Sequence, residues 1–525
     1  MSNHLQPVPK WNFIMGNLLH AGDIFAKLPE CHSAYMMTII SRQFPDHGAF
    51  YFDAWPMMEP MLVVTDPDMA QQLVTHPTVS WVKPRKLQDW FYPITGGPSL
   101  FDSNGAIYKS LHKIYSPAFS SANTLAWNSA FVDRVEVFRD LLRERATTGE
   151  RFLLRPMVLN LVMDVIGEVL LNLNLDCQRS PNPLCEYMTR QLSLKFDEYK
   201  PGNILALLDP TIYYRTWANN RRLNVEISKQ LDVRFAALKE SRKKSSSSSS
   251  AAAPYKSIID LAIEDFLHAN PDAATLTPEF VTTATRNLRM FFFSGHDSTA
   301  TTILYCYYVL SRHPTALSLL RAELDSVFGP YPTPSSRPTQ AASEQIKSHP
   351  QILNSLPYTA AVIRETLRLY PPANSIRYCT TDIDLTDSRG NVYPTAGFSV
   401  LLSHYMIHKN PSFWARADEF LPERWLVGPE HELSPPRNGY RPFETGNRMC
   451  MAQQLVVTEV KSVLACTARE FDVADAYGEV DEGVGRKTNL DGVGGERAFM
   501  VEGGAAHPNG GFPARVRVSG YEGGS

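Results

Sequence analysis

The longest apolar segment, residues 287–310 (NLRMFFFSGHDSTATTILYCYYVL), limits most strongly what this chain can fold into. Its length would suit a membrane span, but His296 and Asp297 lie in its middle, where ionisable side chains are costly in lipid. The segment is therefore predicted to form a central helix buried by the rest of the protein. At 525 residues the chain is long enough to supply a large core around such a helix.

Apolar periodicity on either side of this segment is mostly helical. From about residue 103 to 330, apolar residues recur at spacings of three and four, which is typical of helices packed on one face. Residues 50–75 instead alternate and turn, which predicts short strands followed by a helix capped by Asp66 or Asp68. Residues 514–518 alternate again and predict a late strand. The expected fold class is mainly α with a small β-rich part.

Two polar tracts and the N-terminal segment divide the chain. Residues 242–254 (RKKSSSSSSAAAP) bury too little apolar surface to order themselves and are predicted to form a disordered, solvated loop. A Pro- and Ser-rich stretch at 329–345 is predicted to connect two helical regions. Residues 1–44 contain neither an apolar run of about 20 residues nor a secretory cleavage pattern, so no transmembrane helix is expected there.

Charge and cysteine usage argue against some classes of function. The 51 Lys and Arg residues against 54 Asp and Glu residues give a formal net charge of −3, which provides no basic bias toward nucleic acid. The seven cysteines include no CxxC pair and no zinc-like spacing, which predicts a reducing, intracellular location. Six of them are expected to be buried apolar thiols: Cys31, Cys177, Cys185, Cys306, Cys379 and Cys466.

The first candidate site interrupts the central apolar segment. Gly295 weakens a helix there, and the hydroxyls of Ser298 and Thr299 can bond back to carbonyl groups and bend it. Asp297 beside Ser298 places an acid and an alcohol in an apolar wall, the arrangement that relays protons to a bound oxygen species through a water. A kink whose polar groups are satisfied internally is an equally open interpretation.

The second candidate is an ion-pair network. Glu365 and Arg368, in VIRETLRLYPP, lie three residues apart and can pair on one helix face. The spacing alone is common by chance, but Leu367 and Leu369 indicate that this helix is largely buried. The later stretch FLPERW offers Arg424 as a further cation for Glu365.

The third candidate is the stretch RPFETGNRMCMAQQL, residues 441–455. A thiolate such as that of Cys450 can ligate haem iron, where its electron density favours O–O cleavage, provided that nearby donors and positive charge keep it deprotonated. Gly446 permits a positive φ in the turn, Arg448 can meet a haem propionate, and Phe443 can shield the sulfur from water. A merely buried apolar thiol is the alternative for Cys450.

In this order, the three motifs resemble those of the cytochrome P450 family of haem-thiolate monooxygenases. Phe443-x-x-Gly446-x-Arg448-x-Cys450 is similar to the haem-binding loop of the family. Glu365-x-x-Arg368 with Arg424 resembles its structural Glu-Arg-Arg network, which supports that loop. Residues 294–299 resemble its oxygen-binding helix, so the resemblance implies catalytic positions at Asp297, Ser298 and Thr299. Similar organisation covers about residues 45–520, which implies a single domain with the cytochrome P450 fold after the N-terminal segment 1–44.

The resemblance also implies a cofactor, a reaction and partners. Cys450 would ligate the iron of heme b (iron protoporphyrin IX), and Arg377 would join Arg448 at the propionates. Residues 290–294, 373–376 and 503–512 would line the substrate pocket. One atom of O₂ would be inserted into a small apolar organic substrate, a secondary metabolite as in fungal members, with electrons from NADPH-cytochrome P450 reductase. The enzyme would be cytoplasmic or bound peripherally to the endoplasmic reticulum.

Two departures from the family pattern bear on the site. Tyr108 and His112 stand where the family usually has a tryptophan and a propionate-binding arginine, and a histidine can bind a propionate with a charge that depends on pH. Ser298 replaces the commoner threonine and keeps its hydroxyl. A haem-thiolate isomerase or dehydratase of the same fold, which tends to lose the acid-alcohol pair, and a non-catalytic haem-binding sensor remain alternatives.

Overall fold

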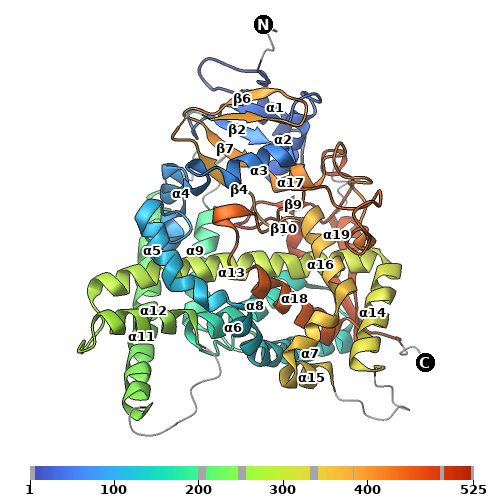
Figure 1. Ribbon diagram of the computed structural model, residues 1–525. Helices are drawn as coiled ribbons and strands as arrows, with labels where there is room; N and C mark the ends of the chain where they lie inside the picture. The colour runs from blue at the N-terminus through green and yellow to red at the C-terminus, as the bar shows by residue number, and fades with distance from the viewer. Residues whose placement is uncertain are drawn as a thin grey trace.

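Helix α13 (Pro278–Arg312) crosses the middle of the protein in a computed structural model that describes residues 6–198, 209–245, 256–331, 341–381, 383–484 and 490–521 (Figure 1). Its start is fixed locally, because Thr277 accepts a hydrogen bond from the backbone N–H of Phe280 and Pro278 occupies the first turn. Nearly all of its residues between 287 and 310 are buried. The prediction of a central buried helix is confirmed.

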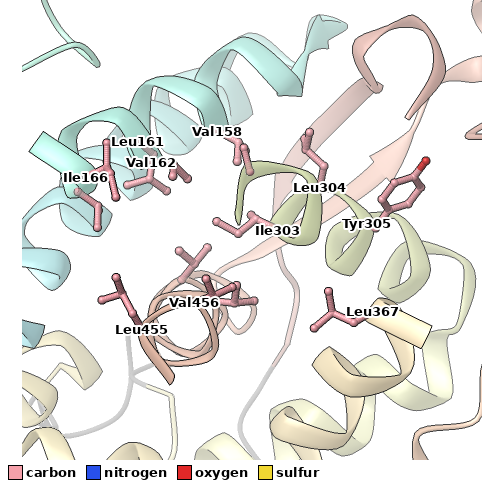
Figure 2. Packing of buried hydrophobic residues seen from close by; sticks show 14 of the residues in the cluster. Val158, Leu161, Val162, Ile166, Ile303, Leu304, Tyr305, Leu367, Leu455 and Val456 are labelled. Atoms are coloured by element: carbon pink, nitrogen blue, oxygen red, sulfur yellow. The ribbon is translucent and has the colours of Figure 1, made fainter. Parts of the chain in front are cut away.

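The main core forms where other helices pack around α13. Apolar side chains of α8 (Leu154–Leu171) and α18 (Gln453–Thr467) face Ile303 and Leu304 of α13, and Leu367 of α16 (Pro357–Leu369) lies alongside them (Figure 2). All of these side chains are buried from water, which is the main favourable term in the folding of a chain of this size. Cores of this kind tolerate little movement, so α13, α16 and α18 form a rigid frame for the segments that they carry.

Short strands form small sheets at the edges of this helical core. The largest contains, in order, β1 (Ala49–Phe52), β2 (Met61–Val64), β7 (Ser399–Leu402) and β4 (Ser375–Tyr378), with β2 and β7 parallel and the other pairs antiparallel. A second sheet, β3-β11-β8, pairs residues 152–153 with residues near the C-terminus. The predicted early strands, the late strand and the helix capped by Asp66 are all confirmed.

The remaining bounds complete the description of the fold. The helices are α1 (Leu18–Phe25), α2 (Ser33–Ser41), α3 (Pro67–Thr75), α4 (Arg85–Thr95), α5 (Gly105–Tyr115), α6 (Ser121–Ala126), α7 (Asn128–Thr148), α9 (Pro183–Ser193), α11 (Pro210–Ser245), α12 (Ile258–Ala269), α14 (Pro314–Phe328), α15 (Ala342–Ser348), α17 (His404–His408) and α19 (Tyr477–Val484). The strands are β1 (Ala49–Phe52), β2 (Met61–Val64), β3 (Phe152–Leu153), β4 (Ser375–Tyr378), β5 (Asp384–Thr386), β6 (Val392–Pro394), β7 (Ser399–Leu402), β8 (Phe471–Asp475), β9 (Met500–Val501), β10 (His507–Pro508) and β11 (Pro513–Val518). Helices dominate, as the periodicity predicts.

Several expectations about connections meet the limits of the described residues. Helix α11 continues to Ser245, so it enters the tract predicted as a disordered loop, and residues 246–254 of that tract lie outside the described residues. Most of the Pro- and Ser-rich connection, residues 332–340, also lies outside them. Among the described helices, none combines the length and the apolar character that crossing a bilayer requires.

The prediction of buried thiols is wrong for two cysteines. Cys177 and Cys185 are joined by a disulfide, because the connection between α8 and α9 turns back and brings their Cα atoms to 6.8 Å. Cys31, Cys306, Cys379 and Cys466 are buried thiols outside the disulfide, as expected.

Candidate active site

The loop that carries Cys450 is a tight turn closed by its own backbone. The backbone N–H of Cys450 donates to the carbonyl oxygen of Phe443 at 2.8 Å. Gly446 has a φ of +74°, as its place in the motif predicts, and a Cβ there would overlap the carbonyl oxygen of Val74 in α3. Glycine is therefore required at this position, both for its backbone conformation and for the close approach of α3.

Cys450 differs from the other free cysteines in its surroundings. It is half-buried, whereas Cys31, Cys306, Cys379 and Cys466 are buried. Burial raises the pKa of the Cys450 thiol, and the backbone N–H of Ala452 acts in the opposite direction by bonding to the sulfur. A bound metal ion would supply the positive charge that a thiolate needs at this position.

The predicted Glu-Arg-Arg network is formed and fully buried. Arg368 Nη2 lies 2.8 Å from Glu365 Oε1, and Arg424 Nε lies 2.9 Å from the same oxygen. Arg368 also donates to the carbonyl oxygens of residues 408, 417 and 419. An ion-pair network without water is stable only when its polar atoms are satisfied, and these contacts fix α16 against the segment 408–425.

His408 connects this network to the Cys450 loop, a link that the sequence analysis missed. Its Nδ1 lies 3.2 Å from the carbonyl oxygen of Arg368, and its Nε2 accepts a hydrogen bond of 2.8 Å from the backbone N–H of Arg441. Burial and then the charges of His404 and Arg368 hold the pKa of His408 well below its usual value. The ring is therefore neutral, donates through Nδ1, and anchors the start of the loop.

One face of α13 is accessible in the middle of the protein. Between residues 287 and 310, the positions that are not buried are Phe291, Ser294, Gly295 and Ser298, at helical spacings of three and four. Ser298 Oγ donates to the carbonyl oxygen of Ser294 at 2.7 Å, as expected for a hydroxyl that bonds backward. We call these four positions the open row of α13.

Asp297 and Thr299 lie outside the open row. Both are buried, and the Asp297 carboxylate contacts His507, the first residue of β10, and the backbone N–H of Ala505, between β9 and β10. The structure thus brings the predicted acid to segment 503–512, which is predicted to line the pocket, and only Ser298 of the three predicted catalytic residues to the open row. The sequence signal for His507 was its place as the one histidine within that predicted segment.

Arg377 is fully buried in β4 and incompletely paired. Its Nε donates to the carbonyl oxygen of Ser80 at 2.8 Å and its Nη1 to Ser375 Oγ at 2.7 Å. Its Nη2 has no hydrogen-bond partner among the described residues. A buried guanidinium nitrogen without an acceptor is costly, so this atom fits a site for an additional anionic group.

Arg448 and Tyr108 pack together beside the loop. The Arg448 guanidinium lies 3.5 Å from the centre of the Tyr108 ring, and its Nη2 donates to the carbonyl oxygens of Trp81 and Ser103. Tyr108 OH donates to the carbonyl oxygen of Asn447 at 3.2 Å. Tyr108 therefore holds the loop that contains Arg448.

His112 lies one turn after Tyr108 in α5. The two rings contact each other, with centroids 5.5 Å apart. Within the part of the chain that the structure describes, the His112 side chain makes no hydrogen bond, so a ligand atom could still bind to it.

Lys83 adds a third cation that the sequence analysis missed. Its ammonium lies 4.9 Å from the centre of the Phe101 ring, and no carboxylate among the described residues forms a salt bridge with it. Burial and then the charges of Arg377 and Arg448 hold the pKa of Lys83 well below its usual value. A single lysine has no characteristic spacing to other site residues, so the sequence does not predict that Lys83 belongs to the site.

These cations fit the carboxylates of a haem. Lys83, Arg377 and Arg448 repel one another in a buried place, with Glu444 as the main nearby anion. Two propionates would neutralise this charge and give Arg377 Nη2 an acceptor. The residues present therefore match the cofactor that the motifs imply.

The predicted pocket wall is only partly accessible. In α13, Met290, Phe292 and Phe293 are buried, whereas Phe291 and Ser294 are not. Ala373 is exposed and Asn374 is half-buried in the stretch before β4. Gly503 and Gly504 are half-buried in the segment between β9 and β10.

Comparisons with known proteins find relatives that match nearly the whole chain. The family model described as Cytochrome P450 matches residues 7–484. The chain is 34% identical over 520 residues to the "Cytochrome P450 monooxygenase polC" of Polytolypa hystricis, covering 98% of this chain and 89% of that protein. It is 31% identical over 512 residues to the "Cytochrome P450 monooxygenase acrF" of Aspergillus aculeatus, covering 93% and 97%. The crystal structure of the cytochrome P450DA heme domain is similar with a TM-score of 0.71 at 18% identity, covering 98% of each chain, which bears on the fold alone.

Proposed function

The chain belongs to the cytochrome P450 family and is a monooxygenase with a cysteine-ligated haem, and from this premise we propose that Cys450 is the axial ligand. The observation that carries this assignment is the Cys450 loop. Its turn is closed by the Phe443 carbonyl, its start is anchored by His408, and Cys450 is the half-buried member of the free cysteines. The Glu365 network supports the loop through His408.

We further propose that the haem propionates are bound by Arg377, Arg448 and Lys83. Their unneutralised charge and the unpaired Arg377 Nη2 support this assignment. His112 is proposed as an additional hydrogen-bond donor, and Tyr108 as the residue that positions Arg448.

The chemistry that bound haem supplies is the reductive activation of O₂ and the insertion of one oxygen atom into an organic substrate. The residues of the chain hold the haem, orient the substrate and deliver protons. We propose that Ser298 Oγ, in the open row, contacts water beside the haem, and that Asp297 is the acid that replenishes protons there, with Thr299 packing behind them. The named relatives are monooxygenases, which does not favour the isomerase or the sensor alternative.

The family takes electrons from a redox-partner reductase and acts on apolar substrates. We propose that NADPH-cytochrome P450 reductase is the partner of this chain and that the substrate is a secondary metabolite. The fungal source of the two relatives from Polytolypa hystricis and Aspergillus aculeatus supports this choice. Phe291 in the open row offers an apolar contact for such a molecule.

We propose that residues 45–520 form one domain and that its N-terminal side contacts a membrane peripherally. One continuous core supports the first point, since it includes side chains from the N-terminal helices to β11. The second is supported by the N-terminal apolar patch, defined as Val8, Trp11, Phe13, Ile14, Trp55, Met57 and Met58, which are all exposed. Such a contact would suit the endoplasmic reticulum.

The assignment of Cys450 is tested by its removal. The purified wild-type protein, reduced and exposed to CO, is expected to show the strongly red-shifted Soret band of a thiolate-ligated haem, and Cys450→Ala is expected to lose it. Cys466→Ala, which removes a buried thiol from α18, is the matched control and should keep the band. An unchanged spectrum in Cys450→Ala would exclude Cys450 as the ligand.

A further inference from the structure

His507, the first residue of β10, bridges two residues of α13. Its Nε2 lies 2.8 Å from Asp297 Oδ1, and its Nδ1 lies 3.0 Å from Thr301 Oγ1. The ring is 1% exposed, and the backbone N–H of Ala505 donates to the second oxygen of Asp297 at 2.5 Å. Both oxygens of the acid are therefore held by one short segment of chain.

The close approach of this segment to α13 is built into its backbone. Gly504 has a φ of +112°, and a Cβ there would lie 2.7 Å from Asp297 Oδ2 and 3.0 Å from the Phe293 ring. The backbone N–H of Ala506 donates to the carbonyl oxygen of Pro372 at 3.0 Å, which holds the segment from its other side. The position of His507 thus follows from the chain around it.

The contacts suit an ionised Asp297. Burial acts to raise its pKa, but His507, His296 and the Ala505 N–H together hold that pKa below its usual value. The short distance between His507 Nε2 and Asp297 Oδ1 favours the ionised form of the carboxylate. The Thr301 hydroxyl can donate to Nδ1 or accept from it, so either protonation state of the ring keeps a partner.

We propose that His507 is a positioning residue that holds Asp297 in the orientation from which this acid passes protons toward Ser298. The inference rests on the proposed role of Asp297 in proton delivery. It explains why the carboxylate is buried beside the pocket-lining segment instead of facing Ser294 and Ser298.

A hydrolytic triad would share this order of hydroxyl, imidazole and carboxylate, but the geometry does not allow it here. Thr301 is fully buried, so no substrate carbonyl can reach its oxygen. Because Thr301, His507 and Asp297 are all buried, they can interact only with one another and with groups that contact Asp297.

The first test follows the fate of O₂ in the holoenzyme supplied with NADPH and reductase, without an organic substrate. Two electrons and two protons convert O₂ into hydrogen peroxide, whereas four of each convert it into two waters. His507→Ala is expected to lower the share of O₂ that becomes water about threefold or more, because Asp297 delivers protons less reliably. His507→Gln, whose amide can donate to Asp297 and accept from Thr301, should recover at least half of the loss.

A matched control and a double variant separate positioning from packing. His268→Ala, which removes an exposed histidine from α12 outside the segments assigned to the site, is the matched control and should leave the share unchanged. Asp297→Asn/His507→Ala should be no worse than Asp297→Asn alone, since His507 acts through Asp297. The proposal would be overturned if the two substitutions lowered the share of O₂ that becomes water by factors that multiply in the double variant. It would also be overturned if His507→Ala left that share unchanged.

A second test does not depend on turnover. In a double-mutant cycle on the thermal unfolding midpoint of the holoenzyme, the two single variants should together lower the midpoint more than the double variant does. Fully additive shifts would show that Asp297 and His507 do not interact, and would overturn the proposal. Failure of the wild-type CO spectrum would instead refute the haem assignment, so the two failures can be told apart.

Discussion

Glu459 is a buried acid on α18 that the haem chemistry does not use. Its side chain is 4% exposed, and its Oε1 has no hydrogen-bond partner among the described residues. Burial raises the pKa of Glu459 to about 8. An unfolded glutamate titrates near about 4.3. Between these values the unfolded chain is ionised while the folded protein keeps the proton, so the free energy of unfolding falls as pH rises from about 4 to 8.

Glu459→Gln is therefore expected to stabilise the protein at neutral pH. The amide mimics the protonated acid and has no ionised form, so the free energy of unfolding should rise by about 2–4 kcal/mol at pH 7. The gain should disappear near pH 4, where Glu459 of the wild type is protonated in both the folded and the unfolded protein. Urea unfolding at pH 4, 6 and 8 measures this, with exposed Glu144→Gln on α7 as the control. A gain that does not depend on pH would contradict the shifted pKa.

Some residues of the site could be predicted from the sequence, and others could not. The motif residues Cys450, Glu365, Arg368 and Arg424 could be predicted because their spacing is local and their chemistry is specific. Lys83, His408 and His507 could not, since each acts through contacts between distant segments. The His507 contact with Thr301, for example, joins residues 206 positions apart.

At the scale of elements, α3 packs so closely against the Cys450 loop at Gly446 that no side chain fits between them. Gly446→Ala would force a positive φ on alanine and press its Cβ into the Val74 carbonyl. The strain alone costs about 1 kcal/mol or more, and the overlap must displace the loop or α3. The variant is expected to bind haem at reduced occupancy.

The ratio of haem absorbance to protein concentration after purification measures that occupancy, and the CO spectrum reports the ligand. Gly22→Ala in α1, where a Cβ meets nothing within 4 Å, is the matched control and should purify with full occupancy. Normal occupancy in Gly446→Ala would show that the loop can shift without loss of the site.

Elements were predictable where their signals are local. The Asp66 cap of α3 acts within a few residues, so the sequence predicts where this helix begins. The disulfide between Cys177 and Cys185 was not predicted, because it depends on how the α8–α9 connection turns back. The direction of the Asp297 side chain likewise depends on a segment that is remote in sequence.

On the scale of the whole molecule, the N-terminal apolar patch is an unusual surface. Phe13 is 86% exposed and Ile14 is 71% exposed, and Trp11 contacts both Phe13 and the Asp53 carboxylate beside Trp55. With a formal net charge of −3, the chain has no general attraction to anionic lipids. Contact with a bilayer would therefore depend on apolar insertion.

The protein is expected to co-sediment with neutral phosphatidylcholine vesicles, with little dependence on salt. Phe13→Ser/Ile14→Ser should weaken this binding about a hundredfold or more, since each side chain contributes roughly 1.5–3 kcal/mol when removed from water. Val518→Ser, an exposed apolar residue near the C-terminus, is the control. Equal vesicle binding by all three proteins would exclude the patch as the membrane contact.

The separation of Asp297 from the open row has a consequence for protein engineering. The open row and the pair Asp297–Thr301 occupy stripes roughly a quarter turn apart on α13, because successive residues rotate by about 100°. Library mutagenesis at Phe291 and Ser294 can therefore reshape the space available to a new substrate while the residues around His507 stay as they are. Substrate selectivity and the share of O₂ that becomes water could then be optimised in separate rounds of mutagenesis on the same helix.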